Sequence, residues 1–211
     1  MYKQKIPASA IPRLSLYYRV LLEHKGSEFI RSGELAQFTN FTAAVVRRDL
    51  AYFGQFGVPG IGYDIAKLKE NILKILGIDV ESKIVLVGVG NLGSALLSYK
   101  GFSEQGFKIA CGFDIDPKKV SKSKGKCNVP IRHIDELTGY IREKNIKMAI
   151  VAVPAPSCQD VVDKLVKAGV RAILNFAPFR PQSPPEIEVL NVDLSIELEK
   201  LAYFLNQIRR K

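Results

Sequence analysis

The sequence predicts an α/β protein in two parts: a small helical domain that ends in a glycine-rich hairpin, and a doubly wound parallel sheet followed by one more helix. Three observations predict it: helical apolar periodicity in residues 1–80, a short apolar strand that runs into the glycine-rich segment 88–93, and a final segment that is apolar on several sides. A chain of 211 residues can build two small cores. We expect domains at 1–80 and 81–193 and a dimerisation helix at 194–211.

The composition is that of a globular protein, with 47% hydrophobic and 25% charged residues, which excludes long disorder. No stretch approaches the roughly 18 apolar residues of a membrane span, and residues 1–12 lack the apolar core of a signal peptide. We therefore expect a cytoplasmic protein without a membrane partner. The net charge of +10 favours polyanions, but it is spread over both halves, so an argument for nucleic acid rests on local placement.

Three cysteines, Cys111, Cys127 and Cys158, lack the short paired spacing of zinc or redox motifs. We interpret them as reduced structural thiols. A thiol-based sensor is the alternative, because Lys126 precedes Cys127 and a neighbouring cation lowers the pKa of a thiol.

Helical spacing in the first domain marks residues 13–23, and Ser32 and Thr42 are suited to cap a second and a third helix. The core face of the third helix comprises Val46, Leu50 and Phe53. Its opposite face carries Ala44, Arg47, Arg48 and Ala51. Two arginines among small residues suit entry into the major groove of DNA, where arginine binds guanine. A solvated basic face without a ligand is the alternative.

A hairpin follows the third helix, because glycines alternate there with apolar residues. These glycines are Gly54, Gly57, Gly60 and Gly62. Three helices and such a hairpin describe a winged helix, and Asp64 then caps a fourth helix that ends at Gly77 before a linker at 78–83. We expect DNA contacts at Thr42, Ala44, Arg47, Arg48 and Tyr63.

The second domain opens with the dinucleotide-binding fingerprint, directly after an apolar strand at 84–87. The fingerprint residues are Gly88, Val89, Gly90, Asn91, Leu92 and Gly93. Gly88 permits the tight turn, Gly90 lets a pyrophosphate approach the backbone, and Gly93 allows close packing of a helix expected at 92–99.

A carboxylate follows at the required distance. The second strand, 109–113, ends at Asp114, which lies 21 residues beyond Gly93 and would bind the ribose hydroxyls. Asp114 and Asp116 together would repel a 2′-phosphate. The cofactors expected are therefore NADH and NAD+.

Further strands are expected at 129–132, 148–153, 172–175 and 188–192, which completes a doubly wound sheet of the Rossmann type. The loops after two of these strands fall at the carboxyl edge, where such sheets bind ligands. We expect the nicotinamide to contact Pro154, Asn175, Phe176, Ala177 and Pro178. An apolar lining without an evident carboxylate would favour the neutral reduced ring over the cationic oxidised one.

The enzymatic alternative is a small NAD-dependent oxidoreductase with a helical N-terminal domain. Tyr140 and Lys144 have the spacing of a Tyr-x-x-x-Lys catalytic pair, but they lie on a charged segment between the third and fourth strands. His24 belongs to the first domain, and His133 lies on the adenine side. No residues remain for a substrate domain, so we expect no enzyme.

The last helix, expected at 194–210, is apolar on more than one side. One stripe consists of Leu194, Leu198, Leu201, Leu205 and Ile208. Ile196 and Tyr203 lie on the opposite side, so the helix needs burial on both, and the chain offers one sheet face. We expect a second subunit to cover the other side; an intramolecular core helix is the alternative.

These features together resemble the Rex family of redox-sensing transcriptional repressors over nearly the whole chain. The resemblance is carried by residues 13–19 (RLSLYYR), 46–54 (VRRDLAYFG), 60–63 (GIGY), 88–93, 175–178 (NFAP) and 191–193 (NVD). It implies a homodimer that binds inverted-repeat operator DNA, represses genes of NADH-reoxidising metabolism such as fermentation, and leaves DNA when NADH rises. It also implies that the subunits exchange their last helices.

The resemblance further implies roles for single residues. Arg47 and Arg48 match the recognition helix, Tyr99 the tyrosine near the nicotinamide, and Arg19 and Asp193 an inter-subunit pair that reports the nucleotide state. The wing departs from the family, because residues 55–62 contain no Lys or Arg. This leaves minor-groove contact by the wing open, and we expect operator affinity to depend more on Lys3, Lys5 and backbone amides.

Overall fold

A computed structural model describes residues 7–122 and 129–209 of the chain. Contacts between residues divide the chain into two compact units, Met1–Val80 and Glu81–Lys211. Lys3, Lys5 and Cys127 lie outside the described residues, so the predictions made for them stay predictions.

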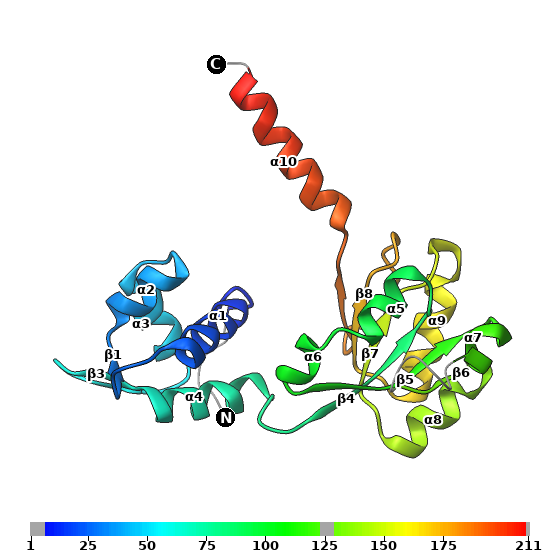
Figure 1. The fold of residues 1–211 in the computed structure, drawn as a ribbon, viewed down its shortest axis with the longest axis horizontal. Coiled ribbons are helices and arrows are strands. Elements are labelled where there is room, and N and C mark those ends of the chain that lie inside the picture. Colours follow the sequence, from blue (N-terminus) through cyan, green and yellow to red (C-terminus); the bar gives the residue numbers. More distant parts are fainter. Residues whose placement is uncertain (1–6, 123–128, 210–211) are drawn as a thin grey trace. The chain divides into compact units, whose positions relative to one another are not determined.

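The first unit is a winged helix, as predicted (Figure 1). Its elements are α1 (Ala10–Glu23), β1 (Phe29–Ile30), α2 (Ser32–Thr39), α3 (Ala43–Ala51), β2 (Gly57–Val58), β3 (Gly62–Asp64) and α4 (Ile65–Leu76). The three strands form an antiparallel sheet of order β1-β3-β2. Strand β1 was not predicted, because a pair of residues is too short to show alternation.

Local capping explains where the helices of this unit begin and end. Thr42 Oγ1 accepts a hydrogen bond from the Val45 amide at 3.3 Å, and Asp64 caps α4 through the Lys67 amide at 3.0 Å. Gly77 ends α4 with a left-handed φ of +65°, which glycine adopts without strain. Both caps and the stop agree with the sequence prediction.

Two details of the first unit differ from the prediction. Ser32 is the first residue of α2 rather than its cap, and Glu34 instead accepts a hydrogen bond from the Arg31 amide at 2.7 Å. Helix α1 begins at Ala10 rather than at residue 13, because the Ala10 amide bonds the Pro7 carbonyl at 2.8 Å and closes an earlier turn.

The second unit is a doubly wound α/β sheet. Its elements are β4 (Ser82–Val87), α5 (Asn91–Leu97), α6 (Gly101–Glu104), β5 (Phe107–Asp114), α7 (Pro117–Lys122), β6 (Ile131–His133), a 3-10 turn (Ile134–Glu136), α8 (Leu137–Lys144), β7 (Met148–Val151), α9 (Ala155–Ala168), β8 (Ala172–Asn175), β9 (Glu188–Asn191) and α10 (Leu194–Arg209). The strand order is β6-β5-β4-β7-β8-β9, and every pairing is parallel. The order reverses between β4 and β7, which is where such sheets bind ligands.

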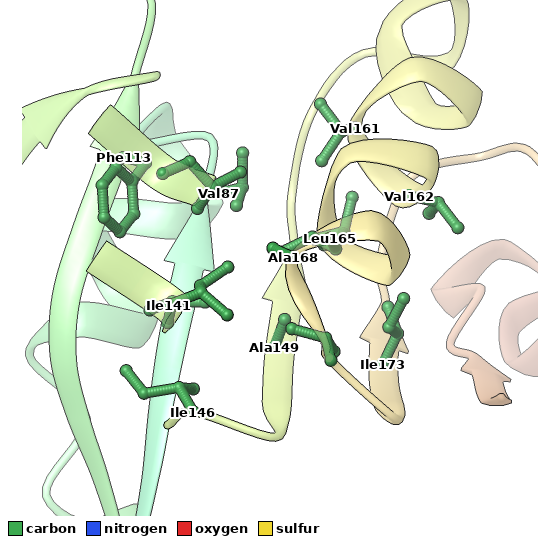
Figure 2. Packing of buried hydrophobic residues seen from close by; sticks show 14 of the residues in the cluster. Val87, Phe113, Ile141, Ile146, Ala149, Val161, Val162, Leu165, Ala168 and Ile173 are labelled. Carbon is green, nitrogen blue, oxygen red and sulfur yellow. The ribbon is translucent and has the colours of Figure 1, made fainter. Parts of the chain in front are cut away.

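Helices cover both faces of this sheet. Alternate residues of the strands, such as Val87 and Phe113, pack with Ile141 of α8 and Leu165 of α9 (Figure 2). The intervening residues, such as Leu86, pack on the other face with residues of α5 and α6. Burial on both faces explains why these strands are continuously apolar.

Helix α10 behaves differently, because none of its residues is buried in the single chain. Leu194, Leu198, Leu201, Phe204 and Leu205 are each at least 57% exposed. The alternative of an intramolecular core helix is therefore wrong for this structure. No helix in the described part of the chain combines the length and apolarity needed to cross a membrane.

Candidate DNA-binding surface and dinucleotide site

The outer face of α3 presents the two predicted arginines. Val46 and Leu50 fix the inner face of the helix in the core, so Arg47, Arg48 and Ala44 on the other side are exposed. Arg47 Nη1 donates a hydrogen bond to Ser32 Oγ at 3.0 Å. This contact orders one arginine before any ligand binds.

The wing lies beside the same arginine. A hollow of about 380 Å³ is lined by the wing residues 57–63 together with Arg31, Ser32 and Arg47. Although the wing contains no Lys or Arg, its surroundings therefore supply two cations. Sequence reasoning did not single out Arg31, because it belongs to the β1–α2 turn and reaches the wing only through the fold.

Tyr63 holds the wing in shape rather than projecting freely. It is half-buried, and a side chain at Gly57 would approach its ring to 3.0 Å. Burial raises the pKa of Tyr63, partly offset by the charge of Arg47, so the phenol is neutral at ordinary pH. A direct DNA contact by Tyr63 stays a prediction.

A buried carboxylate fastens α3 to α1. Asp49 is fully buried, and Arg13 binds it with two hydrogen bonds, from Nε at 2.5 Å and from Nη2 at 2.7 Å. Tyr17 donates a third from its hydroxyl at 2.8 Å. The hydrogen bond and charge of Asp49 raise the pKa of Arg13 against the effect of burial. This contact, in which two residues of α1 bind Asp49 of the arginine-bearing helix α3, was not predicted from sequence.

The glycine-rich loop has the geometry assigned to each glycine. Gly88 has a φ of +96°, and a Cβ there would lie 2.5 Å from the Ala152 carbonyl oxygen. A Cβ at Gly93 would lie 1.9 Å from the Gly88 oxygen, so α5 packs directly on the turn. Gly90 precedes α5 and faces open space. The loop thus leaves its free backbone exposed at Gly90, Asn91 and Leu92.

Asp114 meets this loop at the end of β5. Its Oδ2 accepts hydrogen bonds from the Val89 amide at 2.7 Å and from Lys119 Nζ at 2.9 Å, and its Oδ1 accepts one from the Asp116 amide at 2.9 Å. Burial by itself raises the pKa of Asp114, but the bonds from Lys119 and the backbone amides of Asp116 and Val89 outweigh it and hold the pKa below its ordinary value. The group is a carboxylate at neutral pH.

A cavity of about 430 Å³ opens in front of this carboxylate. Its walls include Gly88, Gly90, Asp114, Lys119 and Pro154, and Val161 of α9 closes one side. This size lies within the range of small-ligand sites. Lys119 was not predicted as a wall residue, although it follows Asp114 by five residues and bonds it from the first turn of α7.

The loop after β8 does not share this cavity. Ala177 and Pro178 line a second hollow of about 280 Å³ with Asp193 and Glu197, while Phe176 packs on the core of the opposite sheet face. The residues expected to form one apolar nicotinamide pocket therefore do not line one hollow, and the start of α10 brings two acids close to Ala177 and Pro178. The nicotinamide contacts stay a prediction.

The three residues of the expected switch lie on different elements. Tyr99 follows α5, which ends at Leu97 rather than at 99. Tyr99 is 61% exposed, and its ring packs edge-on against Phe102 with the ring centroids 5.1 Å apart. Asp193 is exposed, and its Oδ1 accepts a hydrogen bond from the Ser195 amide at 2.9 Å, so it caps α10. Arg19 is exposed on α1 of the other unit.

The candidate catalytic pair lies away from the cavity. Tyr140 donates to the Ala110 carbonyl at 3.4 Å, and Lys144 pairs with Glu143 at 2.9 Å; neither lines the 430 Å³ cavity. Burial raises the pKa of Cys111 to about 11 and also raises that of Cys158, so neither thiol is activated. Among residues 7–122 and 129–209 no group of side chains suits a metal ion.

One chain combines a winged helix that exposes arginines with a sheet of the dinucleotide-binding type. This combination defines the class of ligand-responsive transcription regulators. Family models agree with this division: residues 5–51 match a putative DNA-binding protein N-terminus, and residues 79–179 match a CoA binding domain.

Full-length relatives identify the family. The chain is 45% identical to the redox-sensing transcriptional repressor Rex of Desulfitobacterium hafniense, over 94% of this chain and 95% of that protein. It is 47% identical to the Rex of Carboxydothermus hydrogenoformans, over 94% and 96%. The chain belongs to the Rex family of redox-sensing transcriptional repressors.

Solved structures of this family have the same fold. A crystal structure of RSP in complex with β-NAD+ and operator DNA superposes with a TM-score of 0.91 at 33% identity, covering 98% of this chain and 95% of that one. RSP in complex with β-NADH superposes with a TM-score of 0.84 at 32% identity, covering 98% and 97%.

Proposed function

We propose that this chain binds inverted-repeat operator DNA as a cytoplasmic homodimer and leaves it when NADH binds, so that transcription follows the ratio of NADH to NAD+. One observation carries the proposal: exposed Arg47 and Arg48 on a winged helix share a chain with a cavity that holds a carboxylate, Asp114, against a glycine-rich loop. The RSP structures with operator DNA and with either nucleotide support it.

The cofactor would lie across the carboxyl edge of the sheet. Its pyrophosphate would contact the backbone from Gly88 to Gly93, and its adenosine ribose would bind Asp114 by replacing part of the present hydrogen bonds of that carboxylate. The nicotinamide would lie between Pro154, Tyr99 and the loop 176–178.

The signal would pass between the units through Arg19, Tyr99 and Asp193 of the second subunit. A ligand shifts DNA affinity only by binding two dimer arrangements unequally, and one exchanged ion pair supplies part of a typical coupling of about 1–3 kcal/mol. Asp193→Ala and Tyr99→Phe should leave NADH affinity within a few-fold of wild type and reduce the NADH effect on operator affinity. Full retention of that effect in both variants would place the switch elsewhere.

The deciding experiment is fluorescence anisotropy of a labelled A/T-rich inverted repeat, titrated with the protein in the presence of NADH, NAD+ or neither. We expect operator binding without nucleotide and with NAD+, and release with NADH alone. Equal binding under all three conditions would identify a constitutive DNA-binding protein. No binding at all, together with NADH oxidation by a small carbonyl compound, would favour the oxidoreductase.

A further inference from the structure

The amide of Asn175 is used entirely inside the protein. Asn175 is fully buried at the end of β8. Its Oδ1 accepts the Ala177 amide at 3.0 Å, and its Nδ2 donates to the Phe179 carbonyl at 2.7 Å. The side chain therefore shapes the loop 176–179 from within, and it has no free donor to offer a ligand.

The same amide reaches the neighbouring strand. Asn175 and Asn191 are direct partners in the parallel β8–β9 register, and Asn175 Nδ2 donates to Asn191 Oδ1 at 2.8 Å. The main chain repeats the connection, because the Val192 amide donates to the Asn175 carbonyl at 2.8 Å. One residue thus holds both the loop after β8 and the end of β9.

The end of β9 leads directly into the segment 191–193 before α10, called here the root of α10. Asn191 is followed by Val192 and by Asp193, which caps the helix. Loop and root share the 280 Å³ hollow, where Ala177 and Pro178 face Asp193 and Ile196. A displacement of the loop therefore changes the hydrogen bonds that set the direction in which α10 leaves the sheet.

A change in the direction of α10 would alter the contacts that this helix makes with a second subunit. Its apolar residues are exposed in the single chain, and an apolar helix of this length requires cover. A buried amide that is fully hydrogen-bonded tolerates little independent movement of its partners, because each lost bond leaves a desolvated polar group.

We infer that Asn175 and Asn191 are positioning residues that couple the loop 176–179 to the root of α10, and that their mutual hydrogen bond transmits nucleotide state to the subunit interface. The inference rests on the proposed function, whose nicotinamide site includes this loop. It assigns Asn175 a role different from a direct cofactor contact.

The test compares Asn191→Ala with Asn191→Asp. Asn191 is exposed, so either substitution leaves the core intact, and an aspartate oxygen still accepts the bond from Asn175 Nδ2 whereas alanine does not. The measured quantity is the ratio of operator affinities without and with NADH. Loss of one hydrogen bond should lower the ratio of Asn191→Ala roughly two- to tenfold, while Asn191→Asp stays close to wild type.

Two further measurements separate positioning from other effects. Calorimetry should give Asn191→Ala an NADH affinity within a few-fold of wild type, because the bonds of Asn175 to Ala177, Phe179 and the Val192 amide still hold the loop 176–179. Glu188→Ala is the matched control: Glu188 is exposed on the same strand, the described part of the structure shows no side-chain hydrogen bond from it, and its ratio should be unchanged.

Three results would overturn the inference: a wild-type ratio in Asn191→Ala, an equal loss in Asn191→Ala and Asn191→Asp, or a large loss of NADH affinity in Asn191→Ala. Failure of the proposed function would be visible separately, because wild-type protein itself would then show a ratio near one.

Discussion

At the scale of single residues, the two buried carboxylates, Asp49 and Asp114, have different roles. Asp49 joins α1 to α3 inside the first unit, where it is fully buried and saturated by Arg13 and Tyr17. Asp114 ends a strand at an open cavity, and its partners include a lysine at the cavity wall. One carboxylate therefore fixes the position of the DNA-binding helix, and the other is accessible to a ligand.

Asp49→Ala should destabilise the first unit by about 3 kcal/mol, because removing one member of a buried pair leaves the other charge unpaired. Urea denaturation followed by circular dichroism measures this. Glu70→Ala is the control, since it breaks an ion pair with Lys74 that is exposed on both sides and should change stability little. Equal effects of the two substitutions would show that burial of Asp49 contributes nothing.

Asp114→Ala should weaken NADH through loss of ribose hydrogen bonds and reduce discrimination against NADPH. Calorimetry of both nucleotides on wild type and variant measures the two effects. Asp116→Ala serves as the comparison for NADH affinity, because the main-chain amide of Asp116, not its side chain, bonds Asp114. Loss of the Asp116 charge should reduce only the discrimination against NADPH. If wild-type protein bound NADPH as tightly as NADH, Asp114 would have no part in selectivity.

At the scale of elements, α3 and the wing act together. The hollow between them is lined by Arg31 and Arg47, so the electrostatic attraction that the wing sequence lacks comes from α3 and from the turn before α2. The hydrogen bond from Arg47 to Ser32 limits the side-chain freedom that DNA binding would otherwise remove.

Arg47→Ala and Arg48→Ala should each reduce specific operator binding by about 1–3 kcal/mol, the contribution of a good bidentate contact with guanine. Anisotropy titrations at constant salt should show a smaller loss on random DNA of the same length. Equal losses on both DNAs would mean that these arginines contact phosphates and do not read sequence.

At the scale of the whole molecule, α10 stays uncovered in the single chain. Helix α10 exposes leucines along its length, whereas α9 buries its apolar side against the sheet. A soluble protein rarely leaves such a face open, so a second copy is the expected cover.

Removal of residues 194–211 should therefore convert a dimer into a monomer or an aggregate. Sedimentation velocity on full-length and truncated protein measures the change, and retained binding of NADH would show that the sheet domain still folds. A soluble truncated dimer would contradict the assignment of α10 as the main subunit contact.

Patterns that depend on neighbours in the chain were predictable from sequence. The caps Thr42 and Asp64, the stop at Gly77 and the fingerprint from Gly88 to Gly93 each act within a few residues, so their chemistry is visible in the order of amino acids. The doubly wound sheet follows from the same local information, because alternating apolar strands and helices allow few topologies.

The sequence by itself thus determined the two-part architecture, the family and the type of cofactor. Only the tertiary structure decided that Arg13 saturates Asp49 and that Asn175 bonds Asn191. The physical reason is that a side chain has several possible partners of suitable charge or polarity. Which of them lies within hydrogen-bond distance depends on how distant segments pack, and no local pattern records it.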